Sequence, residues 1–284
     1  MSEAPAAALS LLIRADVARA LEEDLGAIDL SAELIPPWRR AEALIICREP
    51  AVLCGCAWAS LAFSSLDPEI ELDWQHQDGE LITKDTTLAR IRGKARAILS
   101  AERSALNFLQ TLSATATLTR RYVEALNGSK TRVLDTRKTL PGLRRAQKYA
   151  VRVGGGSNHR LGLYDAVLIK ENHIRAAGSI AQAINAARAI AGGRMVEIEV
   201  ESLAEFDLAL AARPDRIMLD ELPHAELLRA LARPREGVEL EISGGVTLER
   251  IGELAALGVD YISVGALTKN IHAIDLSLQL LRNP

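Results

Sequence analysis

The chain has 284 residues, of which 49% are hydrophobic and 25% are charged, and its formal net charge is −3. This length suffices for two domains or for one large barrel with an extension, and the composition is ordinary for a soluble globular protein. Only 4% of the residues are aromatic. Nucleic-acid binders usually present a broad basic face with stacking residues, so nucleic acid is not expected as a partner.

The first seventeen residues, MSEAPAAALSLLIRADV, carry an acidic residue early, and Arg14 interrupts their short apolar stretch. A secretory signal or a membrane span needs a longer uninterrupted apolar run, so neither is expected and a cytoplasmic location is predicted. Cys47, Cys54 and Cys56 lack the paired spacing of a zinc site and lie in or near apolar runs. They are predicted to be small core residues.

The first 112 residues are predicted to form an α+β domain. Residues 9–23 have the pattern of an amphipathic helix, and from residue 41 short apolar runs indicate antiparallel strands with one helix between them. A long helix or helix pair follows. Glu102 and Arg103 are predicted to open it, with Ser100 as a candidate N-cap.

The following part of the chain alternates short apolar runs with stretches rich in alanine and leucine. Such alternation predicts parallel strands joined by helices, and with one further strand near its start the number fits a closed or nearly closed α/β barrel. The fold class predicted is an open or incomplete α/β barrel with an N-terminal α+β domain. The predicted domains are therefore 1–112 and 113–269, and a C-terminal helix at 270–284 is expected to join the first. The predicted barrel strands are 132–136, 165–170, 195–200, 216–220, 238–243 and 261–265.

Positive charge is concentrated between Lys130 and Arg160, where nine Lys or Arg residues stand against one acidic residue, Asp135. A solvated basic helix is the ordinary interpretation of such a run. Here, however, Arg137 and Lys138 directly follow an apolar run with strand character, a Pro-Gly pair breaks the chain after them, and a triple glycine leads into four polar side chains. These features favour a binding site for an anion.

Each predicted barrel strand ends on residues of a functional type, and parallel barrels place their chemistry at these C-terminal ends. The two glycine-bearing turns late in the barrel precede predicted helices, so their free N–H groups are expected to surround a phosphate. The strand-end residues are Arg137 and Lys138; Lys170, Glu171, Asn172 and His173; Glu199 and Glu201; Asp220 and Glu221; Ser243, Gly244 and Gly245; and Gly265 and Ala266.

The stretches DTRKTLPGLR, KYAVRVGGGSNHRLGLYDAVLIKENH, EISGGVTL and ISVGALTKN occur in this order along the chain. They closely resemble the nicotinate-nucleotide pyrophosphorylases, also called quinolinate phosphoribosyltransferases. The resemblance extends over nearly the whole chain and is densest from residue 102 to 275. It implies transfer of phosphoribosyl from phosphoribosyl pyrophosphate to quinolinate with loss of CO2, giving nicotinate mononucleotide and pyrophosphate in de novo NAD biosynthesis.

Under this resemblance, Arg137, His159 and Arg160 are expected to bind the two carboxylates of quinolinate, because charge-assisted donors suit carboxylates. Arg103 is implied to reach the site of the partner subunit. The expected assembly is therefore a homodimer with shared active sites, or a higher oligomer built from it. The turns at Ser243–Gly245 and Gly265–Ala266 are assigned to the substrate phosphates.

The remaining roles concern charge near the reacting atoms. Lys138 and Lys170 are expected near the pyrophosphate and the reacting centre, as compact point charges that need no planar partner. Glu199 and Asp220 are expected to hold ribose hydroxyls, to bind the Mg2+ that accompanies phosphoribosyl pyrophosphate, directly or through water, and to stabilise a cationic transition state. The sequence assigns no role to Lys269 and Asn270.

Three other functions stay open at this point. A Schiff-base aldolase would use Lys170 with Glu199 or Asp220 for proton transfer, although a carbonyl substrate seldom needs so many cations. A related phosphoribosyltransferase could act on a different pyridine or in molybdenum metabolism, but TRKT together with NHR favours a dicarboxylate. A non-catalytic ligand-binding module would bind phosphate tightly without turnover.

Overall fold

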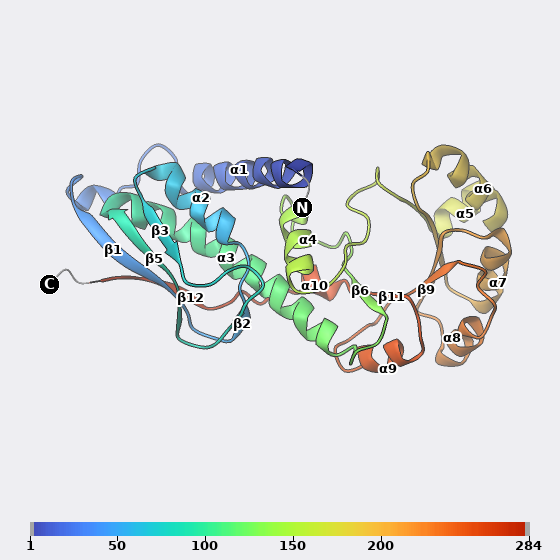
Figure 1. Cartoon of the computed structure of the whole chain (residues 1–284). Coiled ribbons are helices and arrows are strands. Elements are labelled where there is room, and N and C mark those ends of the chain that lie inside the picture. The colour runs from blue at the N-terminus through green and yellow to red at the C-terminus, as the bar shows by residue number, and fades with distance from the viewer. Residues whose placement is uncertain (1–2, 282–284) are drawn as a thin grey trace. The chain divides into compact units, whose positions relative to one another are not determined.

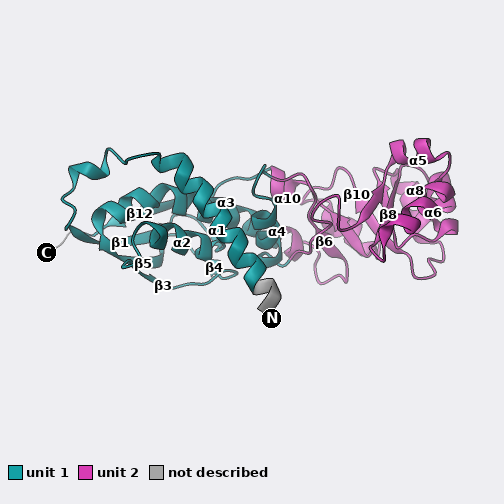
Figure 2. Ribbon diagram, turned by 90° about the horizontal axis from the view of Figure 1, so that it is seen from above, with its two compact units in different colours: residues 1–120, 140–155, 270–284 teal, residues 121–139, 156–269 magenta. Residues whose placement is uncertain are grey.

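The computed structural model describes residues 3–281. The chain divides into two compact units, shown in different colours in Figure 2. Unit 1 comprises Met1–Arg120, Leu140–Gly155 and Asn270–Pro284, and unit 2 comprises Arg121–Thr139 and Gly156–Lys269. The boundary predicted after residue 112 lies within a continuous helix, α3 (Ala95–Glu124), and unit 1 includes this helix up to Arg120. The segment Leu140–Gly155 also belongs to unit 1 rather than to the barrel unit.

Unit 1 is built on an antiparallel sheet of strand order β12-β1-β5-β3, with β2 and β4 paired separately. The helix α2 (Cys56–Leu66) lies between these strands in the chain, so the prediction of antiparallel strands with one intervening helix is confirmed. The strands are β1 (Arg40–Cys47), β2 (Ala51–Val52), β3 (Glu71–Trp74), β4 (Leu81–Ile82), β5 (Thr86–Lys94) and β12 (Leu276–Leu280).

The predicted C-terminal helix is wrong, because this segment forms the strand β12. It pairs antiparallel with β1, with Leu276 opposite Cys47 and Leu280 opposite Ala43. Leucines at every second position alternate with polar residues here, and this period of two is typical of a strand with one buried face. The last residues of the predicted helix, 282–284, lie outside the described part of the chain.

The helices of unit 1 are α1 (Glu3–Leu25), the 3-10 turn η1 (Ala32–Leu34), α2, α3 and α4 (Arg144–Val153). Their apolar faces and the sheet enclose one core that contains Trp58 and Phe63, both fully buried. The helix α3 begins at Ala95, directly after β5 and seven residues before Glu102, where the sequence predicted its start. Ser100 is therefore not an N-cap, and its hydroxyl donates a hydrogen bond of 2.6 Å to Asp29 instead.

Unit 2 is a parallel sheet of six strands in the order β6-β11-β10-β9-β8-β7. Figure 1 labels β6, β11 and β9 of this sheet. All six predicted barrel strands are present. The strands are β6 (Arg132–Leu134), β7 (Val167–Ile169), β8 (Val196–Val200), β9 (Arg216–Asp220), β10 (Glu239–Ser243) and β11 (Tyr261–Ser263). The helices are α5 (Glu171–Ala177), α6 (Ile180–Ala191), α7 (Leu203–Ala212), α8 (His224–Leu231), α9 (Ile251–Ala256) and α10 (Ala266–Lys269).

The sheet does not close into a complete barrel. Its edge strands are β6 and β7, and the further strand expected near the start is not found among residues 3–281; only an isolated bridge joins Leu134 to Ser157. The open α/β barrel is thus confirmed. The loop that contains this bridge carries the Asn-His-Arg segment toward the strand ends.

Gly154 ends α4 at a close contact with α3. A methyl group added there would lie 2.5 Å from the backbone oxygen of Ala116 and 2.7 Å from Cβ of Thr119. Because the backbone of Gly154 is helical, alanine would not strain it locally, and the only effect would be overpacking. We expect Gly154→Ala to lower the free energy of unfolding by about 1–3 kcal/mol in urea unfolding followed by circular dichroism.

The matched control is Arg152→Ala, an exposed position of the same helix. A change there is expected to stay within about 0.5 kcal/mol of the wild type. Equal unfolding free energies for the two variants would contradict the tight packing of α4 on α3.

Candidate active site

A cavity of about 380 Å³ lies at the C-terminal ends of the strands of unit 2. Each of the six strands, or the loop next to it, contributes to its wall. The lining residues are Thr136, Arg137, Lys138, His159, Arg160, Leu168, Lys170, Glu199, Met218, Asp220, Glu241, Ser243 and Ser263. The structure therefore brings eight of the predicted site residues together in one cavity: Arg137, Lys138, His159, Arg160, Lys170, Glu199, Asp220 and Ser243.

The register of the parallel strands explains this convergence. Ser243 of β10 lies opposite Asp220 of β9, and Glu199 of β8 lies opposite Met218 of β9. Side chains two residues apart along a strand point to the same face. Residues that are far apart in the chain therefore meet on one face at one end of the sheet.

Arg137 and Arg160 supply part of the positive charge of the cavity, to which Lys138 and Lys170 also contribute. Both arginines are half-buried. Burial lowers the pKa of the Arg160 guanidinium, and the neighbouring positive charge of Arg137 lowers it further. Two guanidinium groups held close together repel each other, so this arrangement favours a ligand that carries more than one negative charge.

The loop that carries Arg160 is anchored by two aspartates that the sequence interpretation did not assign to the site. The buried carboxylate of Asp135 accepts the backbone N–H of His159 at 2.9 Å and the side-chain amide of Asn158 at 2.6 Å. The carboxylate of Asp165 accepts the N–H of Leu161 at 2.6 Å. The one available signal was that Asp135 is the single acidic residue within a strongly basic stretch.

Lys170 and Glu199 form an ion pair at the cavity wall, in which the lysine side chain is 43% exposed and the glutamate 9%. The backbone N–H of Lys170 donates to Nδ1 of His173 at 3.0 Å, at the start of α5. His173 thus orients the backbone of a predicted catalytic residue. One carboxylate oxygen from each of Glu171, Glu199 and Glu201 lies within 4.8 Å of the others.

The predicted phosphate-binding turns differ from expectation in one respect. Gly244 and Gly245 adopt positive φ angles of 85° and 55° and line an adjacent cavity of about 300 Å³ together with Ser243. The helix expected to follow them begins only at Ile251. Their N–H groups therefore lie in a turn and not at a helix N-terminus, because Thr247 to Arg250 form a further turn before α9.

The second turn contacts the basic strand end directly. A methyl group added at Gly265 would lie 3.1 Å from Cδ of Lys138, so the lysine stem packs against this glycine. Ala266 begins α10. Arg103, in contrast, is exposed on α3 in unit 1, and all the residues that line the cavity belong to unit 2.

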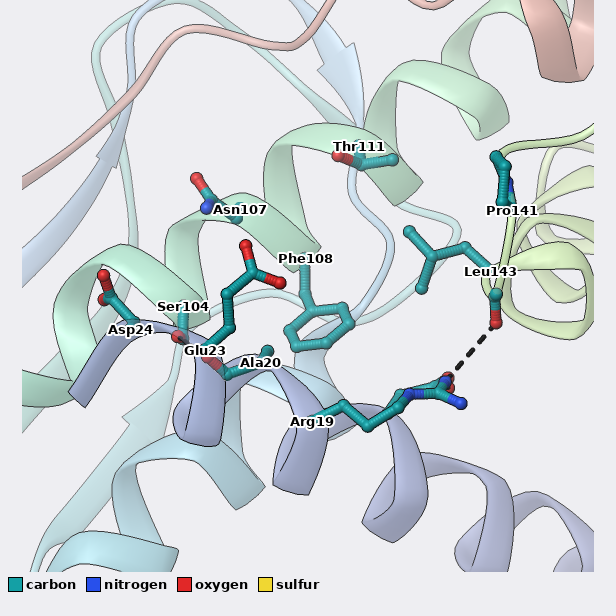
Figure 3. Close-up of a pocket in the computed structure, with 12 residues that line it drawn as sticks. Arg19, Ala20, Glu23, Asp24, Ser104, Asn107, Phe108, Thr111, Pro141 and Leu143 are labelled. Carbon is teal, nitrogen blue, oxygen red and sulfur yellow. Dashed lines mark hydrogen bonds and ion pairs between the residues drawn. The ribbon is translucent and has the colours of Figure 1, made fainter. Parts of the chain in front are cut away.

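Unit 1 contains a second cavity, of about 510 Å³, between α1, α3 and the turn before α4 (Figure 3). Phe108 and Leu143 lie beside it, and Arg19 donates to the backbone oxygen of Gly142 at 3.4 Å. Arg19 is its single basic residue and is already paired with Asp16 at 2.5 Å. Because the wall also carries Glu23 and Asp24, this cavity does not suit an anion.

A group of buried charged residues adjoins the cavity of unit 2, and one of them, Glu241, forms part of its wall. Glu197 and Glu241 are fully buried, and Glu241 accepts a hydrogen bond of 3.2 Å from Arg216. Burial raises the pKa of Glu197 to about 7. Burial, and then the negative charge of Glu197, raise the pKa of Glu241 to about 8.

The raised pKa of Glu241 predicts how stability depends on pH. The folded protein holds a proton on this carboxyl more tightly than the unfolded chain, in which the pKa is near its ordinary value of 4.5. Its contribution to stability is complete below that value and is lost as the pH rises towards about 8. For one proton the loss is about 1.4 kcal/mol per pH unit.

Glu241→Gln is therefore expected to flatten the decline of unfolding free energy across this pH range, measured by urea unfolding at several pH values. Glu253→Gln changes an exposed glutamate of the same unit and should keep the wild-type slope. Equal slopes for the wild type and Glu241→Gln would contradict the assignment.

The fold and the cavity define an open α/β barrel that gathers guanidinium, ammonium and carboxylate groups at its strand ends. Comparison with known proteins identifies the class. The family model "Quinolinate phosphoribosyl transferase, C-terminal domain" matches residues 115–279, and the corresponding N-terminal domain model matches residues 29–113. The chain therefore belongs to the quinolinate phosphoribosyl transferase family.

Individual relatives agree with this classification. A probable nicotinate-nucleotide pyrophosphorylase [carboxylating] of Bacillus subtilis is 42% identical over 260 residues, covering 91% of this chain and 90% of the relative. The nicotinate-nucleotide pyrophosphorylase [carboxylating] of Mycobacterium leprae is 41% identical over 94% of this chain and 96% of its own length. The solved structure of the Francisella tularensis nicotinate-nucleotide pyrophosphorylase matches with a TM-score of 0.92 and 44% identity, covering 96% of this chain and 97% of that chain.

No helix in the described residues, 3–281, has the length and apolar character needed to cross a membrane.

Proposed function

We propose that this protein transfers the phosphoribosyl group of phosphoribosyl pyrophosphate to quinolinate and removes CO2, so that nicotinate mononucleotide and pyrophosphate are formed. The observation that carries the proposal is that Arg137, Arg160 and two lysines line one cavity together with three carboxylates, in a chain of this family. A relative from Nicotiana glauca, 38% identical over 92% of this chain, is named quinolinate phosphoribosyltransferase [decarboxylating] 1, and this name states the same chemistry for that protein.

Quinolinate carries two carboxylates on one pyridine ring. The guanidinium groups of Arg137 and Arg160 can each donate two parallel hydrogen bonds to a carboxylate, and every such charge-assisted bond contributes about 1.5–3 kcal/mol. Burial and then the charge of Arg137 lower the pKa of Arg160, and binding of a dianion would relieve the repulsion between the two arginines. The same cavity would bind nicotinate less well, because one of the two arginines would lack its partner.

The transfer step joins the pyridine nitrogen to the anomeric carbon of the sugar. The carbon–oxygen bond to pyrophosphate breaks, and its electron pair leaves with the pyrophosphate. Lys138 and Lys170 would stabilise that leaving charge, whereas Glu199 and Asp220 would stabilise the positive charge that develops on the sugar. The chain supplies position and electrostatics and forms no covalent intermediate with the substrate.

Loss of CO2 needs an acceptor for the electrons of the breaking carbon–carbon bond. The ring nitrogen becomes positive once it is ribosylated, and it can take up these electrons; a proton then replaces the carboxylate on the carbon. We therefore place transfer before decarboxylation. Rapid-quench detection of a ribosylated dicarboxylate supports this order, whereas free nicotinate as an intermediate contradicts it.

Magnesium is expected to enter with phosphoribosyl pyrophosphate. Glu199 and Asp220 line the cavity, and the oxygen-rich group of Glu171, Glu199 and Glu201 lies beside them. One or two carboxylates together with substrate phosphates are the ligands that Mg2+ usually takes in such sites, so these residues fit the ion. It would neutralise the phosphate charge next to the lysines.

The homodimer and the cytoplasmic location are also part of this proposal. Arg103 is exposed in unit 1, where a partner subunit could use it to complete a site. Cys47, Cys54 and Cys56 are free thiols, as expected of a protein in a reducing compartment.

The direct test is an assay of the purified protein with quinolinate, phosphoribosyl pyrophosphate and Mg2+, in which nicotinate mononucleotide and CO2 are measured together. We expect both products in equal amounts from quinolinate and little product from nicotinate. Activity with nicotinate alone would keep the phosphate sites but overturn the assignment of the dicarboxylate pocket to Arg137 and Arg160.

Lys138→Ala tests the charge at the reacting centre. We expect turnover to fall on the order of a hundredfold or more, because a preorganised charge at the leaving group is lost, while the circular dichroism spectrum stays unchanged. Lys130→Ala is the matched control, since Lys130 precedes β6 and is exposed, whereas Lys138 follows that strand. Near-normal turnover of Lys138→Ala would remove Lys138 from the site.

Mixed dimers test the role of Arg103. Arg103→Ala and Lys138→Ala chains are each expected to be inactive alone, but a mixed dimer would contain one intact site if the arginine acts across the interface. Random exchange should then restore about a quarter of the wild-type activity, because half of the dimers are mixed and each has one intact site of two. No recovery in verified mixed dimers would contradict shared sites.

A further inference from the structure

The interior of unit 2 contains buried charge where barrels usually have branched apolar side chains. Its members come from the neighbouring strands β8 to β11 and from the loop before β7. None of them appears in the chemistry proposed above, although the sequence analysis assigned His159 to the substrate carboxylates. The buried polar residues of this interior are His159, Glu197, Arg216, Glu241 and Ser263.

Arg216 holds one side of this group. Its guanidinium donates to Glu241 at 3.2 Å and to Glu239 at 2.9 Å. It also lies over the ring of Tyr261, 3.8 Å from the ring centre, and the Tyr261 hydroxyl donates to Glu239 at 3.0 Å. Because Glu239 and the ring of Tyr261 hold its guanidinium in place, Arg216 fixes the position of the Glu241 carboxylate.

The other side of the group faces His159. Nε2 of this ring lies 2.9 Å from Oε2 of Glu197 and 3.6 Å from Oε2 of Glu241. Nδ1 accepts the backbone N–H of Arg160 at 2.7 Å. A ring nitrogen that accepts a hydrogen bond carries no proton, so the proton of the neutral ring is on Nε2, the ring nitrogen that lies next to the two carboxyl groups.

We propose that Glu197 and Glu241 are positioning residues that hold His159 as the Nε2–H tautomer, so that its Nδ1 receives the N–H of Arg160 and fixes this arginine in the substrate cavity. This inference rests on the proposed function only where it names quinolinate as the ligand of Arg160. His159 then acts through the backbone of Arg160 and not as a donor to the substrate.

The contact between His159 and the backbone of Arg160 keeps Arg160 in place in the substrate cavity. Arg160 lies near the like charge of Arg137, so repulsion would displace it from a loosely held loop while no anion is bound. Asp135 anchors the loop before Arg160, and Asp165 anchors it after. The contact with Nδ1 fixes Arg160 itself. A displacement of about 1 Å in such a group can cost on the order of a hundredfold in rate.

Two substitutions of His159 separate the two possible roles of the ring. In His159→Asn, the side-chain oxygen can replace Nδ1 as acceptor for Arg160, whereas His159→Gln places its amide near Nε2 and loses that acceptor. We expect His159→Asn to keep a KM for quinolinate near that of the wild type and His159→Gln to raise it on the order of tenfold or more, with the KM for phosphoribosyl pyrophosphate unchanged. The reverse order would mean that Nε2 donates to the substrate and would overturn the proposal.

The carboxyl groups are tested by Glu197→Ala and Glu241→Ala, each with its Glu→Gln counterpart, which retains an acceptor for Nε2–H. The alanine variants should raise the KM for quinolinate on the order of tenfold, and the glutamine variants should recover most of this loss. In the His159→Asn protein the same alanine changes should have no further effect on this KM. Additive effects would overturn the proposal. Glu253→Gln, which changes an exposed glutamate of the same unit outside this group, is the matched control.

A spectroscopic measurement does not depend on activity. Nitrogen-15 NMR of histidine-labelled protein, assigned with His159→Gln, should show a protonated Nε2 and an unprotonated Nδ1 in the wild type. A cationic ring or the Nδ1–H tautomer at neutral pH would contradict the proposal. If the wild-type protein retains one divalent metal ion per chain and the Glu241→Gln variant does not, these residues form a metal site and the proposal is wrong. If quinolinate is not turned over, the NMR result still decides the tautomer, so the two failures are distinguishable.

Discussion

The functional part of this protein depends on the neutralisation of charge inside an open parallel barrel. Carboxylates of Asp135, Glu197 and Glu241 are fully buried, and each would cost several kcal/mol if it were left without compensation. Backbone and side-chain N–H groups donate hydrogen bonds to Asp135. Arg216 lies close to the Glu241 carboxylate, and His159 lies close to the Glu197 carboxylate. The cost of burial is offset by contacts that also fix the loop of Arg160.

This rigidity matters because the proposed chemistry needs no nucleophile from the protein. When catalysis relies on positioning and electrostatics, its rate depends on how precisely the cationic side chains are placed. Arg137 and Arg160 can be kept close together only because the backbone around them is anchored. The exposed end of Lys170, paired with Glu199, adds a charge that can respond to a phosphorylated substrate.

Much of the site could be predicted from the sequence because its signals are local. A strand of the barrel is a short apolar run, so these runs alone are enough to place Lys170, Glu199 and Asp220 at or near strand ends and Lys138 in the loop after β6. Glu197 and Glu241 alternate with apolar residues within their strands, and no local pattern indicates whether such a carboxylate is buried or what compensates it. Their partner His159 lies more than thirty residues away from either one.

The sequence by itself determined the parallel strands, their order in the chain and the type of residue at each strand end, because hydrophobic periodicity and turn residues act over a few neighbours. Only the tertiary structure decided that residues 276–280 form a strand beside β1, that α3 runs through the predicted domain boundary, and that Leu140–Gly155 belongs to unit 1. It also decided which face of each strand is enclosed and which charges meet there. Pairing and burial depend on partners far along the chain, and these contacts exist only once the chain has folded.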